Sequence, residues 1–220
     1  VRKLIFEGRN KEAQRLIDAN FLTQQHGMSY LTLGSLYLEF PAHQNGSGFY
    51  RDLNLENATT TTRYQVDDVT YTRTTFASFT DNVIIMHIKA SKANALNFTI
   101  AYNCPLVHKV NVQNDKLTVT CQGKEQEGLK AALRAECQIQ VKTNGTLRPA
   151  GNTLQINEGT EATLYISAAT NYVNYQDVSA DESHRTSEYL KRAMQIPYEK
   201  ALKNHIAYYK KQFDRVRLTL

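Results

Sequence analysis

The chain has 220 residues and a formal net charge of +5; 41% of its residues are hydrophobic and 21% are charged. This is the composition of a globular protein long enough to bury a core, and it excludes a disordered or fibrous chain. The basic residues gather near both ends at helical spacing beside apolar residues, so they indicate solvated helix faces and exclude a nucleic-acid-binding module.

The first segment, residues 1–22, predicts a helix. Its apolar residues recur near a period of 3.6, with Lys and Arg between them: Leu4, Ile5, Ala13, Leu16 and Ile17. From Leu31 to about Ala169 the period changes to two, which is typical of strands. The chain therefore changes from helical to extended structure soon after its first element.

The strand region begins with an apolar stretch at 31–40, which Gly34 interrupts, and a turn-rich stretch follows at 43–48. Further along, residues 110–119 predict a hairpin that reverses at Asn114-Asp115. Short strands with turn signals between them favour an antiparallel arrangement.

The clearest strand is predicted over Leu129–Val141, where every second residue is apolar and most of the others are polar. Such alternation is typical of a half-buried antiparallel strand. Asn144-Gly145 predicts another reversal, since both residues tolerate positive φ. Residues Glu161–Ala169 predict a last core strand.

The helical period returns after Asp181. Thr186 or Ser187 is the expected cap of a short helix that ends at Met194, and Pro197 suits the first turn of a longer one. One face of the longer helix carries an apolar stripe: Leu202, Ile206, Tyr209 and Phe213. The final six residues alternate like a strand that has nothing after it, so we expect the natural polypeptide to continue.

The predicted fold is mainly β: an antiparallel β-sandwich with an N-terminal helix and C-terminal linker helices, favoured over a barrel by the many short strands. Three regions are expected. Residues 1–22 form a helix packed on the sandwich, residues 28–180 form the sandwich, and residues 181–220 form a helical linker with a final strand.

Metal and cofactor signals are missing from the sequence. Cys104, Cys121 and Cys137 have no metal-ligand spacing. Cys121 and Cys137 lie at alternate positions with apolar residues, so we expect buried free thiols. The six His form no HExxH or similar motif, and His205 is expected to pack or to cap another element. The sequence predicts no cofactor and no metal.

No carboxyl pair stands out as catalytic, although hydrolysis by general acid–base catalysis often uses two positioned carboxyl groups. Glu39 and Asp67-Asp68 are best interpreted as strand-end and turn carboxylates. The full set of candidates is Glu39, Asp52, Asp67, Asp68, Asp81, Glu158, Asp177 and Asp181. No GxSxG elbow or phosphate-binding loop is present. We therefore predict no catalytic residue in this chain.

A polar segment with interleaved aromatic residues follows the last core strand, over 170–177. Aromatic rings can cover the C–H faces of sugars while amides bond the hydroxyl groups. Four side chains are the candidate sugar contacts: Asn171, Tyr172, Asn174 and Tyr175. The alternative is a plain polar loop that packs on a neighbouring domain.

Ordered motifs along nearly the whole chain resemble the bacterial α-L-fucosidases of glycoside hydrolase family 95. They include Tyr50-Arg51, Val69-x-Tyr71-x-Arg73 and Phe76-Ala77-Ser78 in the strand region. Residues 30–40 are similar to a Tyr-x-Pro-Leu-Gly-Asp-Leu-x-Leu-x-Phe pattern of that family but carry Thr32 and Ser35 in place of Pro and Asp. Towards the C-terminus the matching residues are His205, Tyr209, Phe213, Arg215-Val216 and Leu218.

The resemblance implies an N-terminal β-domain that a helical linker joins to an (α/α)6 catalytic barrel. It implies hydrolysis of α-1,2-linked L-fucose with inversion by a Glu acid and an Asp base of the barrel, downstream of Leu220. None of the family's catalytic residues maps onto this chain. By analogy, the loop 170–177 reaches the rim of the active site.

The expected partners are the downstream barrel of the same polypeptide and a fucosylated oligosaccharide or plant or host glycan, with no nucleic acid and no membrane. A periplasmic or secreted location is expected from such a polysaccharide substrate. The alternative function is a freestanding carbohydrate-binding module, against which the absence of Trp counts. An interaction sandwich unrelated to sugars is the third hypothesis.

Overall fold

A computed structural model describes residues 1–21, 32–126 and 128–217 of the chain. In chain order the elements are α1 (Arg2–Phe6), α2 (Asn10–Asn20), β1 (Ser35–Glu39), β2 (Ser47–Asn54), β3 (Thr59–Val66), β4 (Val69–Ser78), β5 (Val83–Ala90), β6 (Leu96–Asn103), β7 (Val107–Gln113), β8 (Lys116–Gln122), β9 (Arg134–Thr143), β10 (Thr146–Ala150), β11 (Thr153–Gly159), β12 (Glu161–Thr170), α3 (Glu182–Met194) and α4 (Tyr198–Phe213). Strands dominate, as the sequence predicts.

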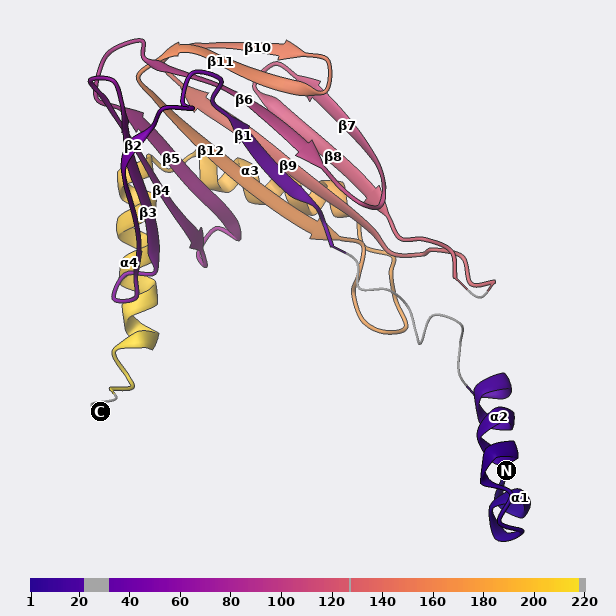
Figure 1. Ribbon diagram of the computed structural model, residues 1–220. Coiled ribbons are helices and arrows are strands. Elements are labelled where there is room, and N and C mark those ends of the chain that lie inside the picture. The colour runs from indigo at the N-terminus through magenta and orange to yellow at the C-terminus, as the bar shows by residue number, and fades with distance from the viewer. Residues whose placement is uncertain (22–31, 127, 218–220) are drawn as a thin grey trace.

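Two antiparallel sheets form a sandwich, which confirms the predicted fold class (Figure 1). The larger sheet has the order β2-β3-β4-β5-β12-β9-β8-β7, and the smaller one has the order β1-β6-β11-β10. The core between them is made by alternate residues of both sheets, among them Leu117, Ile139 and Leu164 from the larger sheet and Ile100 and Ile156 from the smaller. All five side chains are fully buried, as expected of facing sheets that interdigitate.

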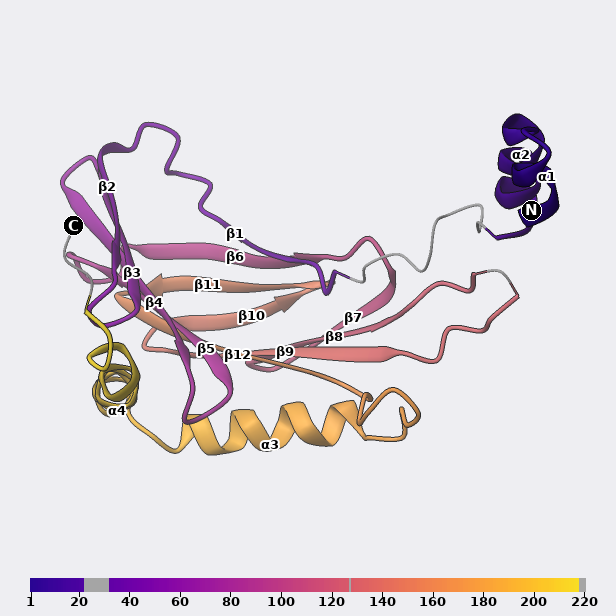
Figure 2. The ribbon, with the colours of Figure 1, turned by 90° about the horizontal axis from the view of Figure 1, so that it is seen from below.

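The outer face of the larger sheet is covered by α3, which packs on β12 and β9 (Figure 2). The prediction of a half-buried strand at 129–141 is therefore wrong in two ways. The strand begins at Arg134, and its polar outer face is buried as well, because Glu136 and Gln138 lie beneath the helix. There Gln138 and Thr186 both bond the Glu136 carboxylate, so the polar atoms are satisfied.

α3 begins earlier than the sequence suggests. Its N-cap is Asp181, whose carboxylate accepts a hydrogen bond from the backbone N–H of His184. Thr186, one of the two expected caps, is instead a buried residue within the helix. The predicted end at Met194 is confirmed, and Pro197 is the N-cap of the next helix.

α4 packs on its own sandwich through Ala201 and His205, which are its two buried residues. The His205 ring stacks on Phe76, and its Nε2 donates to the carbonyl oxygens of Asn57 and Ala58, at 3.1 Å each. The expectation that His205 packs and caps another element is confirmed. Of the predicted apolar stripe, Leu202 packs against the same buried cluster as Ala201, and the Tyr209 hydroxyl donates to the carbonyl oxygen of Leu55, so the stripe borders the buried face.

The N-terminal segment forms two helices, because the chain leaves the helical conformation at Gly8, whose φ is +75°. The single helix predicted over 1–22 is therefore split into α1 and α2. It was also expected to pack on the sandwich, but in Figures 1 and 2 both helices stand apart from the two sheets.

The predicted reversals are present. β7 and β8 turn at Asn114, which has a φ of +53°. β9 and β10 turn at Asn144-Gly145, but neither residue there has a positive φ. Gly145 is needed for a different reason, since a Cβ atom would lie 2.6 Å from the carbonyl oxygen of Asn157. At the C-terminus the described residues 214–217 form no strand, and 218–220 lie outside the described part.

Candidate functional site

The loop between β12 and α3 projects from one end of the sandwich (Figure 1). It exposes two aromatic rings, of Tyr172 and Tyr175, whose residues are 48% and 86% accessible. Val173 between them is also exposed. The loop therefore presents aromatic and aliphatic surface next to backbone polar groups, as a sugar contact requires.

Asn171, the first candidate contact in this loop, is completely buried. Its Oδ1 accepts the backbone N–H of Arg134 at 2.8 Å, and its Nδ2 donates to the carbonyl oxygens of Ala132 and Val178 at 2.9 and 2.8 Å. All its polar atoms are thus used inside the domain. Asn171 fixes the loop to the strand β9 and does not face a ligand, which corrects the sequence interpretation.

Asn174 shapes the tip of the loop. Its Oδ1 accepts the backbone N–H of Gln176 at 2.9 Å, and its backbone pairs with that of Asp177. Hydrogen bonding from the side chain of Ser179, and then from its backbone N–H, lowers the pKa of the Asp177 carboxyl group. Both side chains therefore act as local turn groups that hold Tyr175 outward.

Two arginines tie the loop to the elements around it. Arg185 of α3 donates to the carbonyl oxygens of Thr170 and Tyr172, at 3.0 and 2.8 Å. Arg134 of β9 bonds the Glu182 carboxylate at 2.8 Å, which lowers the pKa of Glu182. The loop base is thus anchored on both sides, while its tip carries the exposed rings.

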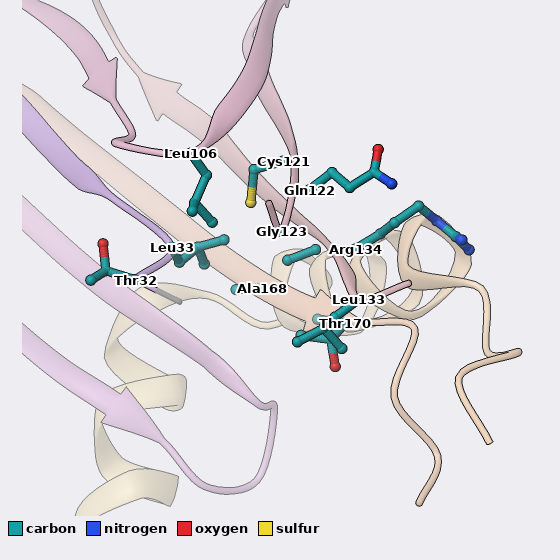
Figure 3. A pocket seen from close by; sticks show the side chains of 12 residues that line it. Thr32, Leu33, Leu106, Cys121, Gln122, Gly123, Leu133, Arg134, Ala168 and Thr170 are labelled. Carbon is teal, nitrogen blue, oxygen red and sulfur yellow. The ribbon is translucent and has the colours of Figure 1, made fainter. Parts of the chain in front are cut away.

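A cavity of about 190 Å³ lies between the two sheets at the same end of the sandwich (Figure 3). Leu33, Leu106 and Cys121 point into it, whereas Gln122 and Arg134 point away. This cavity could not be predicted from the sequence, because its lining comes from segments that are far apart in the chain. Its walls are almost entirely apolar, so it offers no groups for acid–base chemistry.

The three cysteines are free and buried, which confirms their predicted role. Burial raises the pKa of the Cys121 thiol to about 11 and that of Cys137 to about 12. Thiols of this kind stay protonated and unreactive near neutral pH. Within the described residues, no group of three or more His, Cys, Asp or Glu is placed to hold a metal ion.

Several of the carboxylates that the sequence singled out occupy strand ends and turns, whereas Asp52 lies within β2, opposite Thr61 of β3. Asp67 lies in the β3–β4 turn with a φ of +51°, and Asp68 forms an ion pair with Lys92. Asp81 is buried in the β4–β5 turn, where the hydroxyls of Ser78 and Thr80 bond it. Glu39 ends β1. These contacts stabilise the turns.

His87 joins β5 to the start of α4. Its Nδ1 lies 2.9 Å from the Thr163 hydroxyl, and its ring stacks on Tyr198 with centroids 4.2 Å apart. Burial lowers the pKa of the His87 imidazole, and the carboxylates of Glu161 and Glu199 oppose this shift only in part. The folded domain therefore favours the neutral ring.

This predicts a pH dependence of stability. Because the folded pKa of His87 is below the unfolded value of about 6.5, the folded state binds a proton less readily. The contribution of the neutral ring is complete above the unfolded pKa and is lost as the pH falls towards the folded pKa. In denaturation curves, the wild type should lose more unfolding free energy between about pH 7.5 and about pH 5 than His87→Gln. Equal losses would contradict the assignment.

The fold above is an antiparallel β-sandwich with helices at both ends, and comparisons with known proteins assign it to a class. A family model described as "Glycosyl hydrolase family 65, N-terminal domain" matches residues 1–175, so the chain belongs to that family. The sequence motifs resembled glycoside hydrolase family 95. The more general prediction, that the chain is an N-terminal domain of a glycoside hydrolase, is confirmed.

Alpha-L-fucosidase 2 of Arabidopsis thaliana is 26% identical over 250 residues, which cover 100% of this chain and 29% of the plant protein. The chain thus spans less than a third of that relative. A solved structure described as a kojibiose phosphorylase from the human microbiome has a TM-score of 0.53 at 9% identity, covering 75% of this chain and 25% of that one. The latter similarity concerns the fold alone. No helix in the described residues is long and apolar enough to cross a membrane.

Proposed function

We propose that this chain is the non-catalytic N-terminal domain of a glycoside hydrolase that removes α-1,2-linked L-fucose with inversion, and that it supports an (α/α)6 catalytic barrel of the same polypeptide. The single observation that carries the proposal is the similarity to alpha-L-fucosidase 2 along the full length of the chain. Asp68 forms an ion pair with Lys92, and Asp81 accepts a hydrogen bond from Ser78. These contacts support the proposal that the domain has no catalytic carboxyl group.

We propose that the barrel contacts an exposed apolar surface at and beside α4. Tyr208 and Phe79 stack on each other with ring centroids 5.7 Å apart, and both are exposed, as are Phe213 and Val216 further along. Exposed apolar clusters of this kind are typical of contacts between domains. The proposal places the parent enzyme in the periplasm or outside the cell, where fucosylated glycans are met.

The proposal is tested in the full-length polypeptide with four carboxyl groups of this domain neutralised together: Glu39→Gln, Asp67→Asn, Asp68→Asn and Asp177→Asn. We expect kcat on an α-1,2-linked L-fucoside to stay within about twofold of the wild type, because turn carboxylates contribute mainly to stability. A loss of about a hundredfold or more would place a catalytic carboxyl group in this domain. A parallel assay on an α-galactoside tests the substrate, since faster galactoside hydrolysis would contradict the fucose assignment.

We further propose that the tip of the 170–177 loop lines the rim of the active site. Tyr175→Ala in the full-length enzyme should then raise KM about two- to tenfold and leave kcat unchanged, since an aromatic contact is worth about 0.5–1.5 kcal/mol. Tyr50→Ala, which removes an exposed ring from β2, is the matched control. An unchanged KM for Tyr175→Ala would remove this loop from the substrate path.

A further inference from the structure

The chain crosses from the smaller sheet to the larger one at residues 104–106, between β6 and β7. Cys104 is the first residue of this crossover, so it is not held at the spacing of about 10 Å that separates facing sheets. It is buried, and its thiol contacts the carbonyl oxygen of Thr32 at 3.9 Å, on the segment that leads into β1. The crossover thus places a thiol in the space between the two sheets.

Cys121 approaches the same place from the larger sheet, as a buried residue of β8. Its sulfur points into the apolar cavity at the end of the sandwich, where Leu33 and Leu106 also point (Figure 3). Leu33 directly follows the residue whose carbonyl group Cys104 contacts, and Leu106 ends the crossover that Cys104 begins. The segments that border one thiol therefore border the other as well.

The two thiols also interact with each other. Burial is the main cause that raises the pKa of Cys121 to about 11, and the next causes are the charge of Cys104 and a hydrogen bond between the two side chains. Side chains from facing sheets that are this close meet the first condition for a disulfide, which needs Cα atoms within about 6.8 Å.

Cys137 is the other thiol near Cys121, but the strand register places it less well. Cys121 lies opposite Ala135 of β9, whereas Cys137 lies opposite Val119 of β8. The two cysteines are thus diagonal neighbours of an antiparallel pair, with Cα atoms about 7–8 Å apart, which a disulfide does not span without backbone movement. The Cys137 thiol is hydrogen-bonded with the Tyr102 side chain instead. The register therefore selects Cys104 as the partner of Cys121.

We propose that Cys104 and Cys121 are a redox pair, which forms a disulfide between the two sheets by exchange with a small organic disulfide. The Cys121 thiolate attacks one sulfur of the small disulfide, R–S–S–R, and a mixed disulfide forms while R–S⁻ leaves. The Cys104 thiolate then attacks the Cys121 sulfur and expels the second R–S⁻. Each leaving thiolate takes up the proton that a cysteine gave up. The two cysteines are thus oxidised by two electrons, and the small disulfide is reduced to two R–SH molecules.

The cavity beside Cys121 determines which disulfide can react. Its volume is about 190 Å³ and its walls are almost entirely apolar, so it favours a small neutral disulfide over a charged one such as that of glutathione. Cys121, which faces the cavity, is attacked first, and Cys104 resolves the mixed disulfide. Only the scarce thiolate form of Cys121 reacts near neutral pH, so the exchange is slow there and faster at alkaline pH.

The bond would close the loop from residue 104 to residue 121, which contains β7 and nearly all of β8. A cross-link across such a loop stabilises the folded state against opening. The β7–β8 hairpin, which forms one edge of the larger sheet, should therefore open less often in the oxidised form. This inference does not depend on the activity of the parent enzyme.

The experiment treats the full-length polypeptide with hydroxyethyl disulfide at about pH 9, then unfolds it and alkylates the remaining thiols. Trypsin separates the three cysteines into different peptides, since Lys or Arg residues lie between them. Mass spectrometry should find the Cys104 peptide linked to the Cys121 peptide, with the loss of two hydrogen atoms, and an alkylated Cys137. Hydrogen exchange of the β7–β8 amides should slow at least about tenfold on oxidation and recover on reduction.

Cys137→Ala is the matched control, because it removes a buried thiol of the same cluster and should leave the link intact. Cys104→Ala should leave Cys121 with a mixed disulfide that persists. The treatment is repeated in urea just below the unfolding transition, so that limited access cannot hide a competent pair. A link between Cys121 and Cys137, a persistent mixed disulfide in the wild type, or three alkylated thiols after both treatments would each overturn the inference.

Discussion

Asn171→Ala is expected to lower the free energy of unfolding by about 3 kcal/mol, although it lies in a loop. The side chain makes three hydrogen bonds in a completely buried position. Its removal leaves the N–H of Arg134 and the carbonyl groups of Ala132 and Val178 without partners. Buried polar groups that lose their partners cost more than the bonds themselves contribute.

Two further variants separate this role from a role in sugar binding. Asn174→Ala removes one exposed turn contact and should cost less than about 1 kcal/mol. Asn171→Asp keeps the shape and the acceptor for Arg134 but turns two donors into acceptors that face carbonyl oxygens, so it should destabilise about as much as alanine. Urea denaturation measures all three variants. A stable Asn171→Ala with impaired sugar binding would restore the ligand role.

His205→Ala is the second substitution with a large expected effect, a loss of about 3 kcal/mol in unfolding free energy. His205 is buried on α4, stacks on Phe76 with ring centroids 4.8 Å apart, and donates to the carbonyl oxygens of Asn57 and Ala58. Alanine removes the ring contact and leaves a cavity and two carbonyl groups that lack this donor. Helix α4 should then detach more easily from the β2–β3 hairpin.

His205→Phe keeps the stacking and loses the donor, so about half of the loss should remain. Lys203→Ala, at an exposed position of the same helix, is the control and should change stability by less than about 0.5 kcal/mol. Thermal and urea denaturation of the three variants provide the comparison. If His205→Ala were as stable as Lys203→Ala, α4 would not depend on this contact.

The strands of the sandwich could be predicted because a period of two is a local property of the sequence. Leu117-Thr-Val119 and Glu161–Ala169 are recognisable without any neighbour, and the Asn114 turn carries its own signal. The number and spacing of these strands were enough to favour a sandwich. The order of strands in the two sheets depends on pairing between distant segments, and the sequence pattern does not contain it.

Other features depend on which element covers which face. The polar residues of β9 at Glu136 and Gln138 have the same pattern whether water or a helix lies above them. The sequence therefore gave no sign that α3 buries them. The start of α3 was also ambiguous, because Asp181, Thr186 and Ser187 are all good caps, and the choice falls on the residue that reaches a free N–H.

The candidate site shows the same limit. Asn171 and Asn174 look alike in a polar loop, but Asn171 bonds the backbone of residues 37 and 39 positions earlier in the chain, and Asn174 bonds its own turn. Only the exposed rings, Tyr172 and Tyr175, match the surface that was expected of the loop. Composition could identify a region with sugar-binding character, but burial decides which of its side chains are available.

The most direct test of the account compares hydrolysis of an α-1,2-linked L-fucoside by the full-length polypeptide and by residues 1–220. The account predicts that fucose is released by the full-length form and that the chain alone shows no activity above the uncatalysed rate, since the proposed function places the acid and the base in the barrel and the carboxylates of Asp68 and Asp81 are engaged by Lys92 and Ser78. Release of fucose by residues 1–220 would contradict it and would return attention to Glu39, Asp67, Asp68 and Asp177.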